Sequence, residues 1–91
     1  MKRCLTLFLK GKVQGVFFRV RTKETADQLD LTGYVENLAD GRVKVVAEGE
    51  DKKLKQFLDW AQESPDHAKV NDIEKNFSQA SGNFADFEIR Y

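Results

Sequence analysis

The sequence is short of the residues on which cross-links and metal centres depend. Among its 91 residues are one cysteine, Cys4, one histidine, His67, and one proline, Pro65. A single cysteine excludes a disulfide within the chain, which suits a reducing compartment. A lone histidine, with no second histidine or further cysteine to join it, does not make a zinc site or a Cys/His pair. We therefore expect no metal and no cofactor, with His67 in a loop and Cys4 as a small buried apolar residue.

Long apolar runs and an excess of one charge are also missing. The chain carries fifteen basic and fifteen acidic side chains, and the apolar run that follows Arg3 stops at Lys10. That run is too short for a signal peptide or a membrane span. A neutral chain also lacks the broad basic face that a long polyanion requires. We expect a cytoplasmic, monomeric protein that binds neither nucleic acid nor a membrane.

Several catalytic motifs are absent. The sequence has no P-loop ending, no G-x-G-x-x-G and no G-x-S-x-G elbow. An enzyme of this composition must work by positioning and positive charge, without a covalent intermediate or a metal. Phosphoryl transfer from an activated donor is one reaction that needs little more, because the phosphoryl group requires charge stabilisation and an in-line nucleophile.

The patterns that are present predict one α+β domain spanning residues 1–91. Hydrophobic residues make up 41% of the chain, enough to bury a single core. Apolar positions at helical spacing predict helices over 18–29 and 51–64. Strands are predicted over 3–10, 32–38, 42–48, 70–77 and 84–91. The order βαββαβ with an added strand predicts a ferredoxin-like α/β sandwich, an antiparallel four- to five-stranded sheet with both helices on one face.

The stretch from Lys10 to Arg19 is the best candidate for a binding site. Gly11 and Gly15 bracket its first half, residues 10–23 carry five basic side chains and no acid, and a predicted helix begins at its end. Such a turn can direct several backbone amides, together with the positive end of the helix dipole, at one oxyanion, and phosphate fits best. Arg19 falls in the first helical turn, where the dipole disfavours a cation. A bound anion would explain it, and a merely solvated helix end is the alternative.

Asn37 is the second candidate. In the strand over 32–38 it shares the parity of Val35, which faces the core, so its amide points inward where an unpaired polar group costs stability. It precedes the predicted hairpin turn at 39–42. Asn37 is therefore either functional or an amide that ties down this turn.

Two segments resemble the signature motifs of the acylphosphatases, and the similarity extends over nearly the whole chain. They are Gly11-Lys12-Val13-Gln14-Gly15-Val16-Phe17-Phe18-Arg19 and Leu31-Thr32-Gly33-Tyr34-Val35-Glu36-Asn37 with Asp40-Gly41-Arg42-Val43. The resemblance implies a ferredoxin-like fold and hydrolysis of the carboxyl–phosphate bond of small acyl phosphates. The products would be a carboxylate and inorganic phosphate.

The resemblance also implies roles for individual residues. The family's catalytic arginine and asparagine fall on Arg19 and Asn37, the asparagine orienting the attacking water. Its phosphate-binding residues fall on Gln14, Gly15, Val16, Phe17, Phe18 and Arg19. The chain departs from the usual family pattern at Asp30 and Leu38, changes that bear on stability or rate. The alternatives are a non-catalytic module of the same fold that binds phosphate or a phosphoprotein, and an RNA-recognition module.

Overall fold

A computed structural model describes residues 1–12, 18–63 and 69–90. Two helices and five strands make up these segments. They are β1 (Lys2–Lys12), α1 (Phe18–Gln28), β2 (Thr32–Asn37), β3 (Val43–Glu50), α2 (Asp51–Gln62), β4 (Lys69–Gln79) and β5 (Phe87–Arg90). This order confirms the predicted βαββαβ arrangement with an added strand. None of the helices described is long and apolar enough to cross a membrane.

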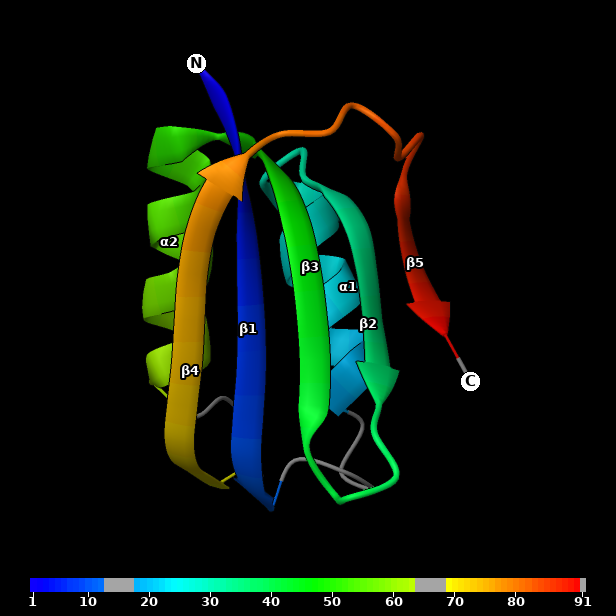
Figure 1. The fold of residues 1–91 in the computed structure, drawn as a ribbon, viewed down its shortest axis with the longest axis vertical. Coiled ribbons are helices and arrows are strands. Elements are labelled where there is room, and N and C mark those ends of the chain that lie inside the picture. The colour runs from blue at the N-terminus through cyan, green and yellow to red at the C-terminus, as the bar shows by residue number, and fades with distance from the viewer. Residues whose placement is uncertain (13–17, 64–68, 91) are drawn as a thin grey trace.

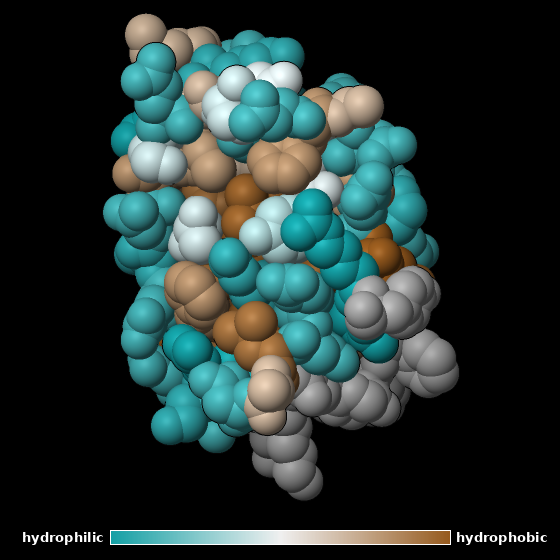
Figure 2. Space-filling view, turned by 45° about the vertical axis from the view of Figure 1, so that its right-hand side comes forward, coloured by the Kyte–Doolittle hydropathy of each residue, from teal (hydrophilic) through white to brown (hydrophobic). Residues whose placement is uncertain are grey.

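The five strands form one sheet in the order β4-β1-β3-β2-β5. Figure 1 shows α1 and α2 on one face of this sheet, as predicted. The other face is open, and Figure 2 views it obliquely from the side of β5, where hydrophilic side chains cover most of the surface and apolar ones lie in small patches. One buried face and one solvated face are the usual arrangement for a sheet with antiparallel pairs.

The sheet is not wholly antiparallel, which corrects the prediction. β5 pairs with β2 in parallel, with Val35 opposite Ile89 and Glu36 opposite Arg90. The reason lies in the connection after β4. This strand ends where β2 begins, and Figure 1 shows the chain crossing over that end of the sheet before it enters β5. β5 therefore starts beside the start of β2 and runs in the same direction. It begins at Phe87, later than the predicted Phe84.

The core lies between the sheet and the helices. Alternate residues of β1 and β3 and a stripe on each helix are buried, as their spacing predicts. These residues include Leu5, Leu7, Leu9, Val43, Val45, Ala47, Phe18, Ala26, Leu54, Phe57, Leu58 and Ala61. Burying each large side chain contributes about 1.5–3 kcal/mol of transfer free energy. This packing fixes the direction of both helices against the sheet.

α1 ends in a hydrogen-bonded reversal in which Asp30 takes the left-handed conformation, with φ of 56°. The amide of Leu31 donates to the carbonyl of Ala26 over 2.9 Å, and the amide of Asp30 donates to that of Asp27 over 3.2 Å. This is the Schellman arrangement, in which glycine is the usual residue at the left-handed position. Asp30 therefore takes the place that glycine usually holds in this turn.

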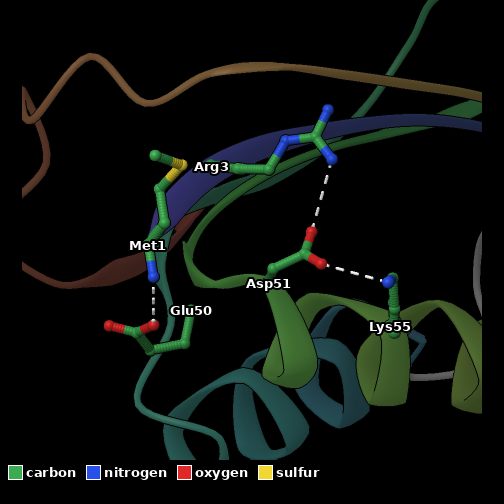
Figure 3. Close-up of polar contacts among 5 residues, drawn as sticks. All are labelled: Met1, Arg3, Glu50, Asp51 and Lys55. Carbon is green, nitrogen blue, oxygen red and sulfur yellow. Dashed lines mark hydrogen bonds and ion pairs between the residues drawn. The ribbon is translucent and has the colours of Figure 1, made fainter.

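α2 begins with a favourable charge arrangement. Figure 3 shows the Asp51 carboxylate between Arg3, 3.4 Å away, and Lys55, 3.1 Å away. The hydrogen bond from Lys55 is the main cause that lowers the pKa of Asp51, and the positive charges of Lys55 and Arg3 lower it further. An acid in the first turn complements the helix dipole. Both helices begin where the sequence predicts, α1 at Phe18 and α2 at Asp51, but only α2 has an acid in its first turn.

Candidate active site

Arg19 is held at the start of α1 by the burial of its neighbour. Phe18, the first residue of the helix, is only 2% exposed and stacks on Trp60 of α2, with ring centroids 5.8 Å apart. The hydroxyl of Thr22 donates to the carbonyl of Phe18 over 2.7 Å, which secures the first turn. Because the Phe18 side chain packs into the core, the side chain of the next residue, Arg19, points to a different side of the helix. Arg19 is half-buried at the margin of the core.

The charge at this helix end is the opposite of what the dipole favours. The first turn of α1 contains no acidic residue, whereas α2 has Asp51 in the same place. Arg19 and the exposed Arg21 instead bring positive charge to the positive end of the helix. Positive side chains and a positive helix end together stabilise an anion.

Arg19 is connected to the end of β2 through β5. Its Nη1 donates a hydrogen bond of 2.9 Å to the backbone carbonyl of Arg90. Arg90 lies opposite Glu36, the residue before Asn37. In Figure 1, α1 begins and β2 and β5 end at the same end of the molecule. The two residues singled out from the sequence, Arg19 and Asn37, thus lie at one end of the fold on neighbouring elements.

Asn37 is the last residue of β2 and is half-buried. Its side-chain oxygen Oδ1 is buried and, in the part of the chain that the structure describes, has no hydrogen-bond partner. An unsatisfied buried acceptor costs stability and calls for an explanation. An acceptor kept for a ligand or a water molecule is such an explanation.

The turn after Asn37 is closed without that oxygen. The amide of Leu38 donates to the carbonyl of Arg42 over 2.8 Å, and the amide of Gly41 donates to the carbonyl of Leu38 over 3.1 Å. The carboxylate of Asp40 accepts bonds from the backbone amide and the Nε of Arg42, at 3.1 and 2.8 Å. These two bonds lower the pKa of Asp40. The alternative role, in which the Asn37 amide ties down the turn, has no support from Oδ1.

The structure describes only part of the predicted phosphate-binding stretch. Phe18 and Arg19 are described, whereas Gln14, Gly15, Val16 and Phe17 lie outside the described residues, as does His67. No group of three or more His, Cys, Asp or Glu side chains that could hold a metal ion occurs in segments 1–12, 18–63 and 69–90.

Cys4 is buried, and this burial is the main cause that raises the pKa of its thiol; the negative charge of Glu48 raises it further. A thiol with a raised pKa is a poor nucleophile.

Comparison with known proteins identifies the family. Residues 5–89 match the family model for acylphosphatase. The chain belongs to the acylphosphatase family. An acylphosphatase of Dehalococcoides mccartyi (strain CBDB1) is 46% identical over 89 residues, which cover 97% of this chain and 98% of the relative. One from Pseudomonas aeruginosa is 45% identical over 87 residues, which cover 96% of this chain and 94% of the relative.

Solved structures agree with the sequence relatives. The acylphosphatase from Bacillus subtilis superposes with a TM-score of 0.92 at 34% identity, covering 98% of this chain and 99% of that one. An acylphosphatase from Coxiella burnetii gives a TM-score of 0.90 at 36% identity, covering 98% of this chain and 93% of the other. These findings confirm the ferredoxin-like fold and the predicted enzyme class, hydrolysis of acyl phosphates.

Proposed function

We propose that the enzyme hydrolyses acyl phosphates by holding the phosphoryl group between backbone amides of residues 14–18 and the guanidinium of Arg19, while Asn37 orients the attacking water. The observation that carries this proposal is the buried, unpartnered Oδ1 of Asn37, at the same end of the fold as Arg19. A carbonyl oxygen can accept a hydrogen bond from water and so direct a lone pair of the water at phosphorus. A guanidinium fork matches the oxygens of a phosphoryl group.

The reaction then balances without a metal or a covalent enzyme intermediate. The water oxygen forms a bond to phosphorus as the bond between phosphorus and the acyl oxygen breaks. The electron pair of the broken bond leaves with the carboxylate, a good leaving group that needs no protonation. The proton of the water passes to an oxygen of the phosphate itself, so the site requires no strong base. The positive charge of Arg19 stabilises the phosphoryl group in transit.

Steady-state hydrolysis of benzoyl phosphate, with excess chelator present, tests this proposal. We expect turnover that does not depend on the chelator, and a fall in kcat/KM of roughly 10²-fold or more for Arg19→Ala. Lys52→Ala is the matched control, because it removes a positive charge from an exposed side chain in the first turn of the other helix, α2. An Arg19→Ala variant with full activity would contradict the assignment. The monomeric state, the single domain and the cytoplasmic location remain predictions from the sequence.

A further inference from the structure

Arg90 makes contacts on both faces of the sheet. Its backbone carbonyl accepts the hydrogen bond from Arg19, whose helix lies on the covered face. Its guanidinium carbon lies 3.7 Å from the centre of the Tyr34 ring. Tyr34 has the opposite parity to the buried Val35, so this ring belongs to the open face. A single residue therefore joins an aromatic ring on the open face to an arginine on the helix face.

The contact between Arg90 and Tyr34 is a close stack. Among the described residues, Arg42 lies over Phe8 at 5.0 Å and Arg3 over Phe77 at 5.1 Å, both at greater distances. A guanidinium carbon 3.7 Å from the ring centroid is in contact with the ring face, whose π electrons make it attractive to a cation. The pairing of β2 with β5 explains the contact, because Glu36 lies opposite Arg90, and Tyr34 is the next residue of β2 on the same face.

Tyr34 is a firm support for this contact. It is 9% exposed and lies in the middle of β2, next to the fully buried Val35. Its ring also contacts Phe84, with centroids 5.9 Å apart, in the connection that leads to β5. Arg90, in contrast, is an exposed residue at the end of a four-residue edge strand. Backbone at the end of an edge strand is held by few ladder bonds, so a side-chain anchor matters there.

We propose that Tyr34 is a positioning residue for Arg19 and acts through Arg90. Stacking on Tyr34 fixes the Arg90 side chain, which holds the Arg90 carbonyl in place as an acceptor for Arg19 Nη1. A long side chain that binds phosphate loses less entropy on binding when it is already oriented. This inference rests on the proposed phosphate-binding role of Arg19. It assigns to an open-face aromatic residue a part in substrate affinity.

The test compares Tyr34→Leu, Tyr34→Phe and Arg90→Leu in KM and kcat for benzoyl phosphate and in the inhibition constant of inorganic phosphate. Loss of the stack should raise KM and the phosphate inhibition constant by about three- to tenfold in Tyr34→Leu and Arg90→Leu. Tyr34→Phe keeps the ring and should behave as the wild type. The double variant Tyr34→Leu/Arg90→Leu should raise KM no further than the more impaired single variant, because both substitutions remove the same contact between Tyr34 and Arg90.

Phe77→Leu is the matched control for a loss of stability. It removes a half-buried ring that lies under Arg3, near the opposite end of the sheet from Arg19. All variants are assayed well below their melting temperatures. Wild-type KM and phosphate inhibition in a folded Tyr34→Leu would overturn the inference, as would Tyr34→Leu and Arg90→Leu effects that multiply. If Arg19→Ala keeps full activity, the proposed function fails first, and this inference fails with it.

Discussion

The carboxylate of Glu48 accepts hydrogen bonds from both the backbone amide and the hydroxyl of Ser81, at 2.9 and 2.8 Å. A third comes from the amide of Gly82 at 3.0 Å. Glu48 is only 5% exposed, although it lies on the open face of β3. Its carboxylate ties down the connection between β4 and β5. Glu48 thereby anchors the segment that leads into β5, the strand whose last residue, Arg90, accepts the hydrogen bond from Arg19.

We expect the protein to lose stability in acid as Glu48 becomes protonated. Burial opposes ionisation, but the bonds from Ser81 and Gly82 outweigh it and lower the pKa of Glu48 below its ordinary value of 4.5. A carboxyl with a lowered folded-state pKa stabilises the fold above its unfolded pKa and loses this contribution as pH falls through the folded value.

Replacing Glu48 should therefore change both stability and its pH dependence. We expect Glu48→Gln to lower the free energy of unfolding at pH 7 by about 1–3 kcal/mol. The difference from the wild type should shrink as pH falls below 4.5 and through the lowered pKa of Glu48. Urea unfolding at several pH values measures this, with the exposed Glu74→Gln as control. A difference that stays constant with pH would show that the charge of Glu48 is not the cause.

Asp30 is expected to limit stability. It holds the left-handed position at the end of α1, where a side chain costs about 1–2 kcal/mol and negative charge is disfavoured by the dipole. Asp30→Gly should raise the free energy of unfolding by about 1 kcal/mol, as measured by urea unfolding. Asp30→Asn, which removes only the charge, should give a smaller gain. A destabilised glycine variant would mean that the Asp30 side chain makes a compensating contact.

Gly33 should not tolerate any side chain. A Cβ built there would lie 1.8 Å from the backbone oxygen of Val46 in the neighbouring strand, and the residue has φ of +135°. Gly33→Ala should cost about 4 kcal/mol or more, or prevent folding. Gly41→Ala is the matched control, because Gly41 also has a positive φ, 93°, but its added Cβ would meet nothing within 4 Å. The control should cost about 1–3 kcal/mol. Equal losses in thermal or urea unfolding would contradict the steric argument.

Arg19→Lys separates charge from geometry at the proposed site. Lysine keeps the positive charge but loses the planar fork that can bind two phosphoryl oxygens while Nη1 reaches the Arg90 carbonyl. We expect kcat/KM for benzoyl phosphate to fall about 10- to 100-fold, less than in Arg19→Ala. Wild-type kinetics for the lysine variant would show that a point charge suffices.

Patterns within single elements predict much of this fold. The apolar stripe of α2, including Leu54 and Phe57, and the alternation of Val43 and Val45 are local features, and both are buried where their spacing indicates. The inward parity of Asn37 identifies a polar group at a buried position, and its Oδ1 is buried.

Features that depend on contacts between distant segments could not be predicted in this way. Parity alone places Glu48 on the solvent side of β3, and it is buried only because Ser81 and Gly82 fold over it. The parallel direction of β5 depends on the path of the connection after β4. The partner of Arg19 is a backbone carbonyl, that of Arg90, and no side-chain pattern marks a carbonyl as an acceptor.

The most direct test of the proposed mechanism measures kcat together with the inhibition constant of inorganic phosphate in Asn37→Ala. If Asn37 Oδ1 directs the water and Arg19 binds phosphate, kcat should fall by about 10²-fold or more. The inhibition constant of inorganic phosphate should change by less than about threefold. Asn76→Ala, an exposed asparagine in β4, should match the wild type in both. A large loss of phosphate affinity with unchanged kcat would contradict the role of Asn37, because that residue would then hold phosphate and not water.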